Sequence, residues 1–130
     1  HKEYRRQRQM CIRDRLQSKQ IILNSNIYDY NTTFKEKFDI VYAAGILHHV
    51  TDIILFLRIC YDYLKFGGKL IIETSISDEI QYKGLNELGW DWFILSKKAL
   101  KDISSDIGLK LIHVFDWNII DNRSIFLLQK

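Results

Sequence analysis

The sequence predicts an α/β domain with a mostly parallel sheet and an antiparallel final strand. Two apolar runs of strand length, at 38–44 and 69–74, flank one amphipathic helical pattern. This order is the strand–helix–strand unit of a parallel sheet covered by helices. Two more apolar runs, at 109–117 and 124–129, are separated only by a short turn-like stretch, which indicates a hairpin at the end of the chain.

Length and composition restrict the class of protein. With 130 residues, 47% hydrophobic and 27% charged, the chain is large enough for one domain with a real core. No apolar run reaches the length that a membrane span requires. Cys11 and Cys60 lie far apart in the sequence, so neither a disulfide framework nor a zinc site is indicated. We therefore expect a cytoplasmic, reducing location.

The basic charge is concentrated at the N-terminus. The formal net charge is +3, but residues 1–15 carry six basic and two acidic side chains, which leaves −1 for residues 16–130. A basic arm can bind nucleic acid. The run RRQRQMCIRDR at 5–15, however, resembles translated sequencing-adapter read-through. We therefore expect residues 1–18 to be a non-native leader, with the natural protein beginning further upstream, and nucleic-acid binding to lack support from the charge of the remaining chain.

The first elements after this leader are two predicted strands. The short apolar run at 19–24 is the first, and the turn formers Asn24 to Asn26 end it. The run at 38–44 is the second, and Gly45 then allows a tight backbone turn.

A helix is predicted to begin after Thr51 or Asp52, either of which is a suitable N-cap. Apolar residues then recur every three or four positions up to Leu64, and Gly67 is expected to end the helix at the C′ position. Cys60 belongs to the apolar stripe, so we interpret it as a core residue and not as a nucleophile.

A polar and aromatic stretch at 77–93 separates the strand at 69–74 from a second helix. Ser96 is the predicted N-cap of that helix, which runs to Ile107 and ends at Gly108. The two terminal strands follow.

The runs FDIVYAAGILHHVTD (38–52), LKFGGKLIIET (64–74) and WFILSKKALKDISSDIGLKLIHVFD (92–116) closely resemble the C-terminal half of class I S-adenosylmethionine-dependent methyltransferases. The resemblance covers roughly residues 20 to 130. It implies a partial Rossmann-like sheet made of the family's third to seventh strands, and S-adenosyl-L-methionine as cofactor. Residues 19–130 are accordingly expected to be the C-terminal part of a methyltransferase domain.

The sequence departs from the family pattern in three ways. Phe66 stands where the family usually has proline. In addition, no stretch matches the first strand with its glycine-rich loop, or the acidic residue that holds the cofactor ribose. We therefore expect the 130-residue chain alone to be inactive and to show no measurable cofactor binding.

The resemblance assigns five residues to the cofactor. Asn26 and Ile27 match the family's adenine-edge pair, so the amide oxygen of Asn26 would accept a hydrogen bond from the adenine amino group while Ile27 packs on the ring. Ala43, Ala44 and Gly45 match the backbone along the methionine portion of the cofactor. The alternative interpretations are that Asn26 is simply a turn residue and Ala44 simply a core residue.

His48 and His49 are the candidate catalytic residues. One of them would lie beside the transferred methyl group, as a general base or as a hydrogen-bond donor that positions the acceptor. We expect His48 to face the substrate, whereas His49 is expected to shape the loop by capping the next helix or binding a carbonyl. No metal site is expected, because adjacent residues point apart and no Cys, His or Asp cluster completes a ligand set.

Within the family, LIIETSISDE (70–79) and the 92–103 run most resemble the branch that modifies the wobble uridine of tRNA. That branch has tyrosine where this chain has His48, and the tyrosine helps to hold a carboxylated cofactor, so ordinary S-adenosylmethionine is expected here. Either tRNA or a small molecule is a possible acceptor. Trp90, Trp92 and Phe93 are candidates for stacking on a base or covering the site, or alternatively for filling the core under a long loop.

Two other function classes compete with methyl transfer. One is a non-catalytic α/β module, derived from a methyltransferase, that acts through protein contacts. The other is half of a nicotinamide-binding oxidoreductase, which the terminal hairpin and the Gly45–His49 turn disfavour. Stabilisation of the complete protein by S-adenosylhomocysteine would distinguish the methyltransferase from both.

Overall fold

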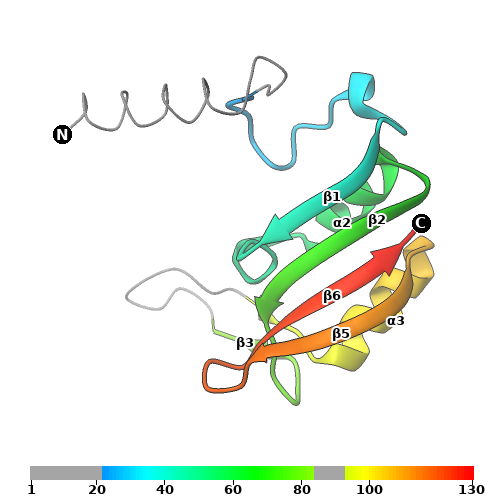
Figure 1. The fold of residues 1–130 in the computed structure, drawn as a ribbon. Helices are drawn as coiled ribbons and strands as arrows, with labels where there is room; N and C mark the ends of the chain where they lie inside the picture. Colours follow the sequence, from blue (N-terminus) through cyan, green and yellow to red (C-terminus); the bar gives the residue numbers. More distant parts are fainter. Residues whose placement is uncertain (1–21, 84–92) are drawn as a thin grey trace, which may run out of the picture.

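The computed structural model describes residues 22–83 and 93–130, whose main element is a four-stranded sheet (Figure 1). The strand order is β1–β2–β6–β5, with β1 parallel to β2 and β6 antiparallel to both of its neighbours. The four strands are β1 (Phe38–Ala44), β2 (Leu64–Ser75), β5 (Lys110–Asn118) and β6 (Arg123–Gln129). The predicted fold class, mostly parallel with an antiparallel final strand, is confirmed.

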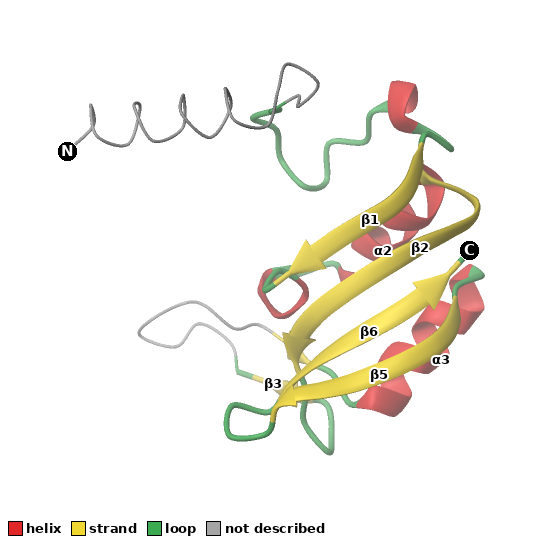
Figure 2. Ribbon diagram, in the orientation of Figure 1, coloured by secondary structure: helices red, strands yellow, loops and turns green. Residues whose placement is uncertain are grey.

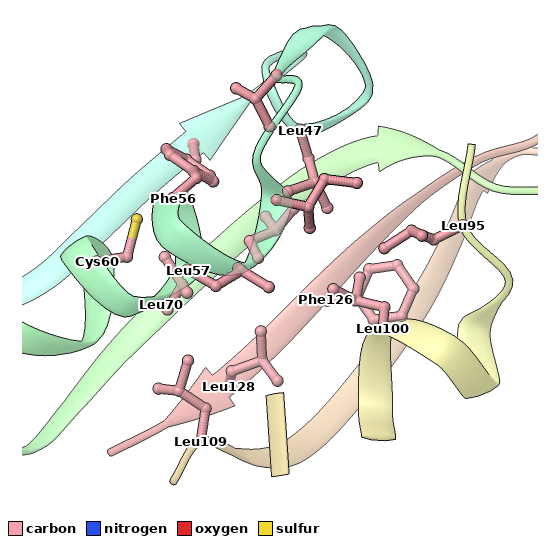
Figure 3. Close-up of a cluster of buried hydrophobic side chains, with 14 of the residues drawn as sticks. Leu47, Phe56, Leu57, Cys60, Leu70, Leu95, Leu100, Leu109, Phe126 and Leu128 are labelled. Atoms are coloured by element: carbon pink, nitrogen blue, oxygen red, sulfur yellow. The ribbon is translucent and has the colours of Figure 1, made fainter. Parts of the chain in front are cut away.

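Two α-helices, α2 (Ile53–Tyr63) and α3 (Lys97–Ile107), lie behind the sheet in the view of Figure 2 and cover one of its faces. Buried side chains alternate with more exposed ones along β6 and part of β2, which agrees with helices on one face. The buried side chains are those of Leu70, Ile72, Phe126 and Leu128. These side chains form the core together with Leu57 and Leu100 from the helices, among others (Figure 3). Among the described residues, the remaining elements are two 3-10 turns and a two-stranded sheet: η1 (Thr32–Phe34), η2 (Leu47–His49), β3 (Gln81–Tyr82) and β4 (Phe93–Ile94).

Helix α2 begins as predicted but ends early. The carboxylate of Asp52 accepts a hydrogen bond from the Leu55 amide at 2.9 Å, which makes Asp52 the N-cap. The prediction that Gly67 ends this helix is wrong: Leu64 is already extended, fully buried and paired with Phe38, so β2 starts there. Gly67 instead lies where the β1–β2 register shifts, and its φ of +81° suits a glycine.

Helix α3 and the terminal hairpin form as predicted. The Ser96 hydroxyl accepts a hydrogen bond from the Ala99 amide at 3.0 Å, and Gly108 ends the helix in the left-handed region with φ +114°. Strands β5 and β6 then pair antiparallel. Capping residues and apolar periodicity are local features of a sequence, which is why the pattern predicts these boundaries closely.

The strand predicted over 19–24 is not formed at residues 22–24, and 19–21 lie outside the described ranges. Ile22 and Leu23 are 60% and 53% exposed and have no neighbouring strand in the described part of the chain. Because an isolated strand leaves its backbone groups unpaired, the segment follows an irregular path with local turns. The described sheet therefore begins at β1 and contains four of the five strands that the resemblance implies. In the described ranges 22–83 and 93–130, neither helix has the length and apolar character that a membrane crossing requires.

Candidate functional site

A cavity of about 690 Å³ lies between the irregular segment that precedes β1 and one side of α2. Its walls include Asn26, Ile27 and Ala43, three of the five residues predicted to contact the cofactor. Ile46 and Phe56 add apolar surface. The fold thus brings together residues that were selected from two separate sequence motifs.

Asn26 organises a turn in the wall of this cavity. Its side-chain oxygen accepts a hydrogen bond from the Tyr28 amide at 2.9 Å, and the Asp29 amide donates to the Asn26 carbonyl at 3.0 Å. Asn26 is therefore part of a turn. The same amide oxygen has a second lone pair, so the turn does not prevent it from accepting a further hydrogen bond.

The three small residues at the end of β1 have different surroundings. Ala43 is buried and lines the cavity, whereas Ala44 is exposed, so the alternative interpretation of Ala44 as a core residue is wrong. Gly45 has φ +65° and donates its amide to the Glu73 carbonyl at 2.8 Å. A Cβ at Gly45 would lie 3.6 Å from Arg123 Nη2, so the backbone here passes close to a charged pair.

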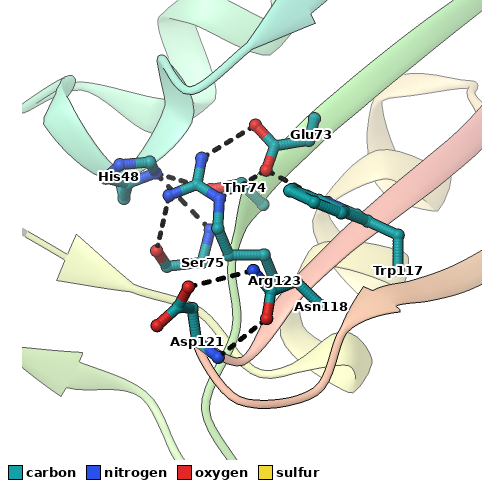
Figure 4. Close-up of polar contacts among 8 residues, drawn as sticks. All are labelled: His48, Glu73, Thr74, Ser75, Trp117, Asn118, Asp121 and Arg123. Carbon is teal, nitrogen blue, oxygen red and sulfur yellow. Dashed lines mark hydrogen bonds and ion pairs between the residues drawn. The ribbon is translucent and has the colours of Figure 1, made fainter.

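The two candidate histidines differ in exposure. His48 is only 4% exposed, and its Nδ1 lies 3.0 Å from Thr74 Oγ1 and 3.5 Å from the Ser75 amide nitrogen (Figure 4). His49 is exposed, with its ring centroid 4.1 Å from that of His48. The structure thus places His48 against the end of β2 and leaves His49 at the surface.

A polar cluster that was absent from our sequence predictions lies beside these residues at the carboxyl end of β2 (Figure 4). Arg123 binds Glu73 through two hydrogen bonds, Nε to Oε1 at 2.5 Å and Nη2 to Oε2 at 2.7 Å. Trp117 Nε1 donates to the same carboxylate at 3.3 Å, and Arg123 Nη1 donates to Ser75 Oγ at 3.4 Å. The hydrogen bonds from Arg123 hold the pKa of Glu73 below its usual value.

One signal in the sequence could have revealed this cluster. Glu73 sits in the apolar strand run KLIIET and is 8% exposed. A buried carboxylate needs a cationic or hydrogen-bonding partner. The sequence does not identify that partner, because Arg123 lies 50 positions further along the chain.

A second, more polar cavity of about 250 Å³ adjoins Arg123 on the side of α3. Lys97 forms an ion pair with Asp116 at 2.8 Å, and the Ser124 hydroxyl donates to the other carboxylate oxygen at 2.7 Å. The hydrogen bond from Lys97 is the main reason why the pKa of Asp116 is lowered.

Two further predictions concern metal ligands and aromatic residues. The described part of the chain contains no cluster of His, Cys, Asp or Glu that could hold a metal ion. Trp90 and Trp92 lie outside the described residues, while Phe93 packs against the core and against Tyr82.

Comparison with curated proteins identifies relatives that modify tRNA. The tRNA U34 carboxymethyltransferase of Alteromonas mediterranea is 34% identical over 89 residues, which cover 64% of this chain and 27% of the relative. The enzyme of the same name from Helicobacter acinonychis is 33% identical over 97 residues, covering 69% of this chain and 37% of the relative. The chain thus spans about a quarter to two fifths of the length of these relatives.

The fold is shared with a solved methyltransferase. The crystal structure of Burkholderia thailandensis 1,6-didemethyltoxoflavin-N1-methyltransferase, with bound 1,6-didemethyltoxoflavin and S-adenosylhomocysteine, superposes with a TM-score of 0.72 at 13% identity. The match covers 83% of this chain and 49% of that one.

A family model described as a methyltransferase domain matches residues 5–72. The match starts within residues 1–18, whose non-native origin stays a prediction. Because it includes more than half of the 130 residues, and because the sheet has the corresponding topology, the chain belongs to the methyltransferase domain family and has the fold of class I S-adenosylmethionine-dependent methyltransferases.

Proposed function

We propose that this chain is part of an S-adenosylmethionine-dependent methyltransferase and that the cavity of about 690 Å³ receives the adenosine end of the cofactor. The observation that carries the proposal is the convergence of Asn26, Ile27 and Ala43 on one cavity. The three residues come from two separate sequence motifs, which the fold brings to one place.

The chemistry of the cavity walls fits a nucleoside. Asn26 offers an amide oxygen to the adenine amino group, while Ile27 and Phe56 offer apolar surface to the flat ring. Beyond Ala43, the exposed Ala44 and the glycine at position 45 would allow the methionine portion to lie close to the backbone. The bound cofactor supplies an activated methyl group, so the protein mainly has to position donor and acceptor.

The acceptor would approach from the side of Gly45, where the two histidines and the Glu73–Arg123 pair gather. On this proposal His48 and His49 are the residues that hold the acceptor or take its proton. His49 is the more accessible of the two, whereas His48 is held at Nδ1 by the end of β2.

Two acceptor classes each have one supporting observation. The names of the curated relatives favour a uridine in tRNA. The net charge of −1 over residues 16–130 favours a small molecule, since binding of a polyanion usually requires basic surface. We propose the cytoplasm as the compartment, with support from the free, buried thiol of Cys60.

The proposal is tested by calorimetric titration of S-adenosylhomocysteine into the whole protein that carries this sequence. Wild type should show saturable binding. Ala43→Leu should abolish it by filling the cavity, and Asn26→Ala should raise the Kd about tenfold by removing a hydrogen bond. Ser105→Ala, an exposed change on α3 outside the cavity, is the control and should leave the Kd unchanged. Absence of binding by the folded wild-type protein would favour the non-catalytic module instead.

A further inference from the structure

Two tyrosine hydroxyls connect the segment that carries the adenine-edge pair to the two ends of α2. The hydroxyl oxygen of Tyr28 accepts hydrogen bonds from the Thr51 and Asp52 amides, both at 3.0 Å, just before the first turn of the helix. At the other end of α2, the Tyr63 hydroxyl accepts a hydrogen bond from the Asn31 amide at 2.8 Å. Residues 28–31 are therefore joined to the two ends of α2 by tyrosine hydroxyls and not by strand pairing.

Tyr28 differs from its neighbours in where it lies. Asn26, Ile27, Asp29 and Tyr30 all line the cavity of about 690 Å³, whereas Tyr28 is not among the lining residues. Its ring packs against the core, and its hydroxyl reaches the start of α2. Any influence of Tyr28 on the cavity must therefore act through other residues, such as Ile27 and Asp29 on either side of it.

The contact joins two loops with separate proposed tasks. Residues 26–31 hold the adenine-edge pair, and residues 45–52 hold the two histidines. The Tyr28 hydroxyl is also 3.3 Å from Thr51 Oγ1, so the oxygen that accepts two amide hydrogens can direct its own hydrogen to that atom. Within the described residues, every hydrogen bond found between these two loops is made by this hydroxyl.

We propose that Tyr28 is a positioning residue that couples cofactor binding to the order of the histidine loop at 45–52. The inference rests on the proposed function, because it needs the cofactor in the cavity. When Asn26 and Ile27 close on adenine, the Tyr28 hydroxyl is held against Thr51 and Asp52, and the end of the histidine loop is held with it. Without the hydroxyl, the two loops are ordered independently.

The test is to titrate S-adenosylhomocysteine into the whole protein and to measure amide hydrogen exchange of the 46–52 peptide with and without this ligand. In wild type the ligand should slow exchange of that peptide. Tyr28→Phe keeps the ring but removes the three polar contacts, so its Kd should rise about tenfold and the slowing should disappear. Tyr82→Phe, on an exposed tyrosine of β3, is the matched control and should behave as wild type.

The outcomes separate the two proposals. If wild type does not bind the ligand, the proposed function fails and the coupling fails with it. If wild type binds while Tyr28→Phe shows the same Kd and the same slowing, only the coupling is overturned. If Tyr28→Phe does not fold, Thr51→Val decides the question, because it removes only the side-chain partner at 3.3 Å. A Kd raised about threefold, with weaker slowing of exchange, then supports the coupling, and unchanged values overturn it.

Discussion

Arg123 at the start of β6 donates two hydrogen bonds to the carboxylate of Glu73 on the neighbouring strand β2, from Nε to Oε1 and from Nη2 to Oε2. Their side chains are only 24% and 11% exposed. The pair therefore joins the start of β6 to the carboxyl end of β2 in a position partly shielded from water, directly beside Gly45. This edge of the sheet is the one at which open α/β folds place their ligands.

Glu73→Gln should destabilise the fold by about 2 kcal/mol at neutral pH, because it leaves a half-buried guanidinium without its charged partner. The pKa of Glu73 is lowered in the folded state, so its stabilising effect is complete above the unfolded pKa of about 4.3 and is lost as the pH falls through the lower folded value. Urea unfolding at pH 7 and pH 3 would measure this. The exposed Glu79→Gln is the control, and an equal loss at both pH values would contradict the assignment.

Ser104→Ala should stabilise the protein by roughly 1 kcal/mol. The Ser104 hydroxyl is completely buried and has no hydrogen-bond partner among the described residues, and alanine also has the higher helix propensity. The exposed neighbour Ser105→Ala changes only the propensity, so its gain should be smaller. Thermal unfolding of both variants measures this difference. An equal increase in stability for the two variants would show that burying the Ser104 hydroxyl does not destabilise the protein.

Lys130→Met should lower the free energy of unfolding by about 1–2 kcal/mol. The Lys130 ammonium donates to the carbonyls of Tyr61 and Leu64 at 3.0 and 2.8 Å, so it caps the end of α2, and it also lies 4.2 Å from the centroid of the Tyr61 ring. Methionine keeps the apolar stem but loses these contacts. Lys101→Met on the exposed face of α3 is the control in urea titrations, and matching midpoints for the two variants would refute a capping role.

Cys60 should react slowly with a disulfide reagent while the protein is folded. Burial raises the pKa of its thiol to about 12, so almost none of the reactive thiolate is present at pH 8. In a Cys11→Ser background, Cys60 is the one remaining cysteine of the sequence. The absorbance of the thiol that leaves the disulfide reagent should therefore rise only when urea unfolds the chain. Rapid labelling of the native protein would contradict the interpretation of Cys60 as a core residue.

The features that the sequence predicts well are those determined within a few residues. Asp52, Ser96 and Gly108 act on backbone groups of their own helices, and the apolar runs of β1 and β6 are long enough to specify strands. The family motifs also selected Asn26, Ile27 and Ala43, which line one cavity together with residues from α2.

The features that the sequence does not predict were decided by pairing between distant parts of the chain. Leu64 leaves the helix because Phe38 pairs with it, and the apolar run at 22–24 stays irregular because no described strand lies beside it. Glu73 and Arg123 are each ordinary charged residues until β2 and β6 pair. Residue types and their spacing therefore determined the elements and the family. The polar clusters, the burial of His48 and the attachment of Tyr28 to α2 were decided by tertiary structure, because each depends on groups that only folding brings within hydrogen-bonding distance.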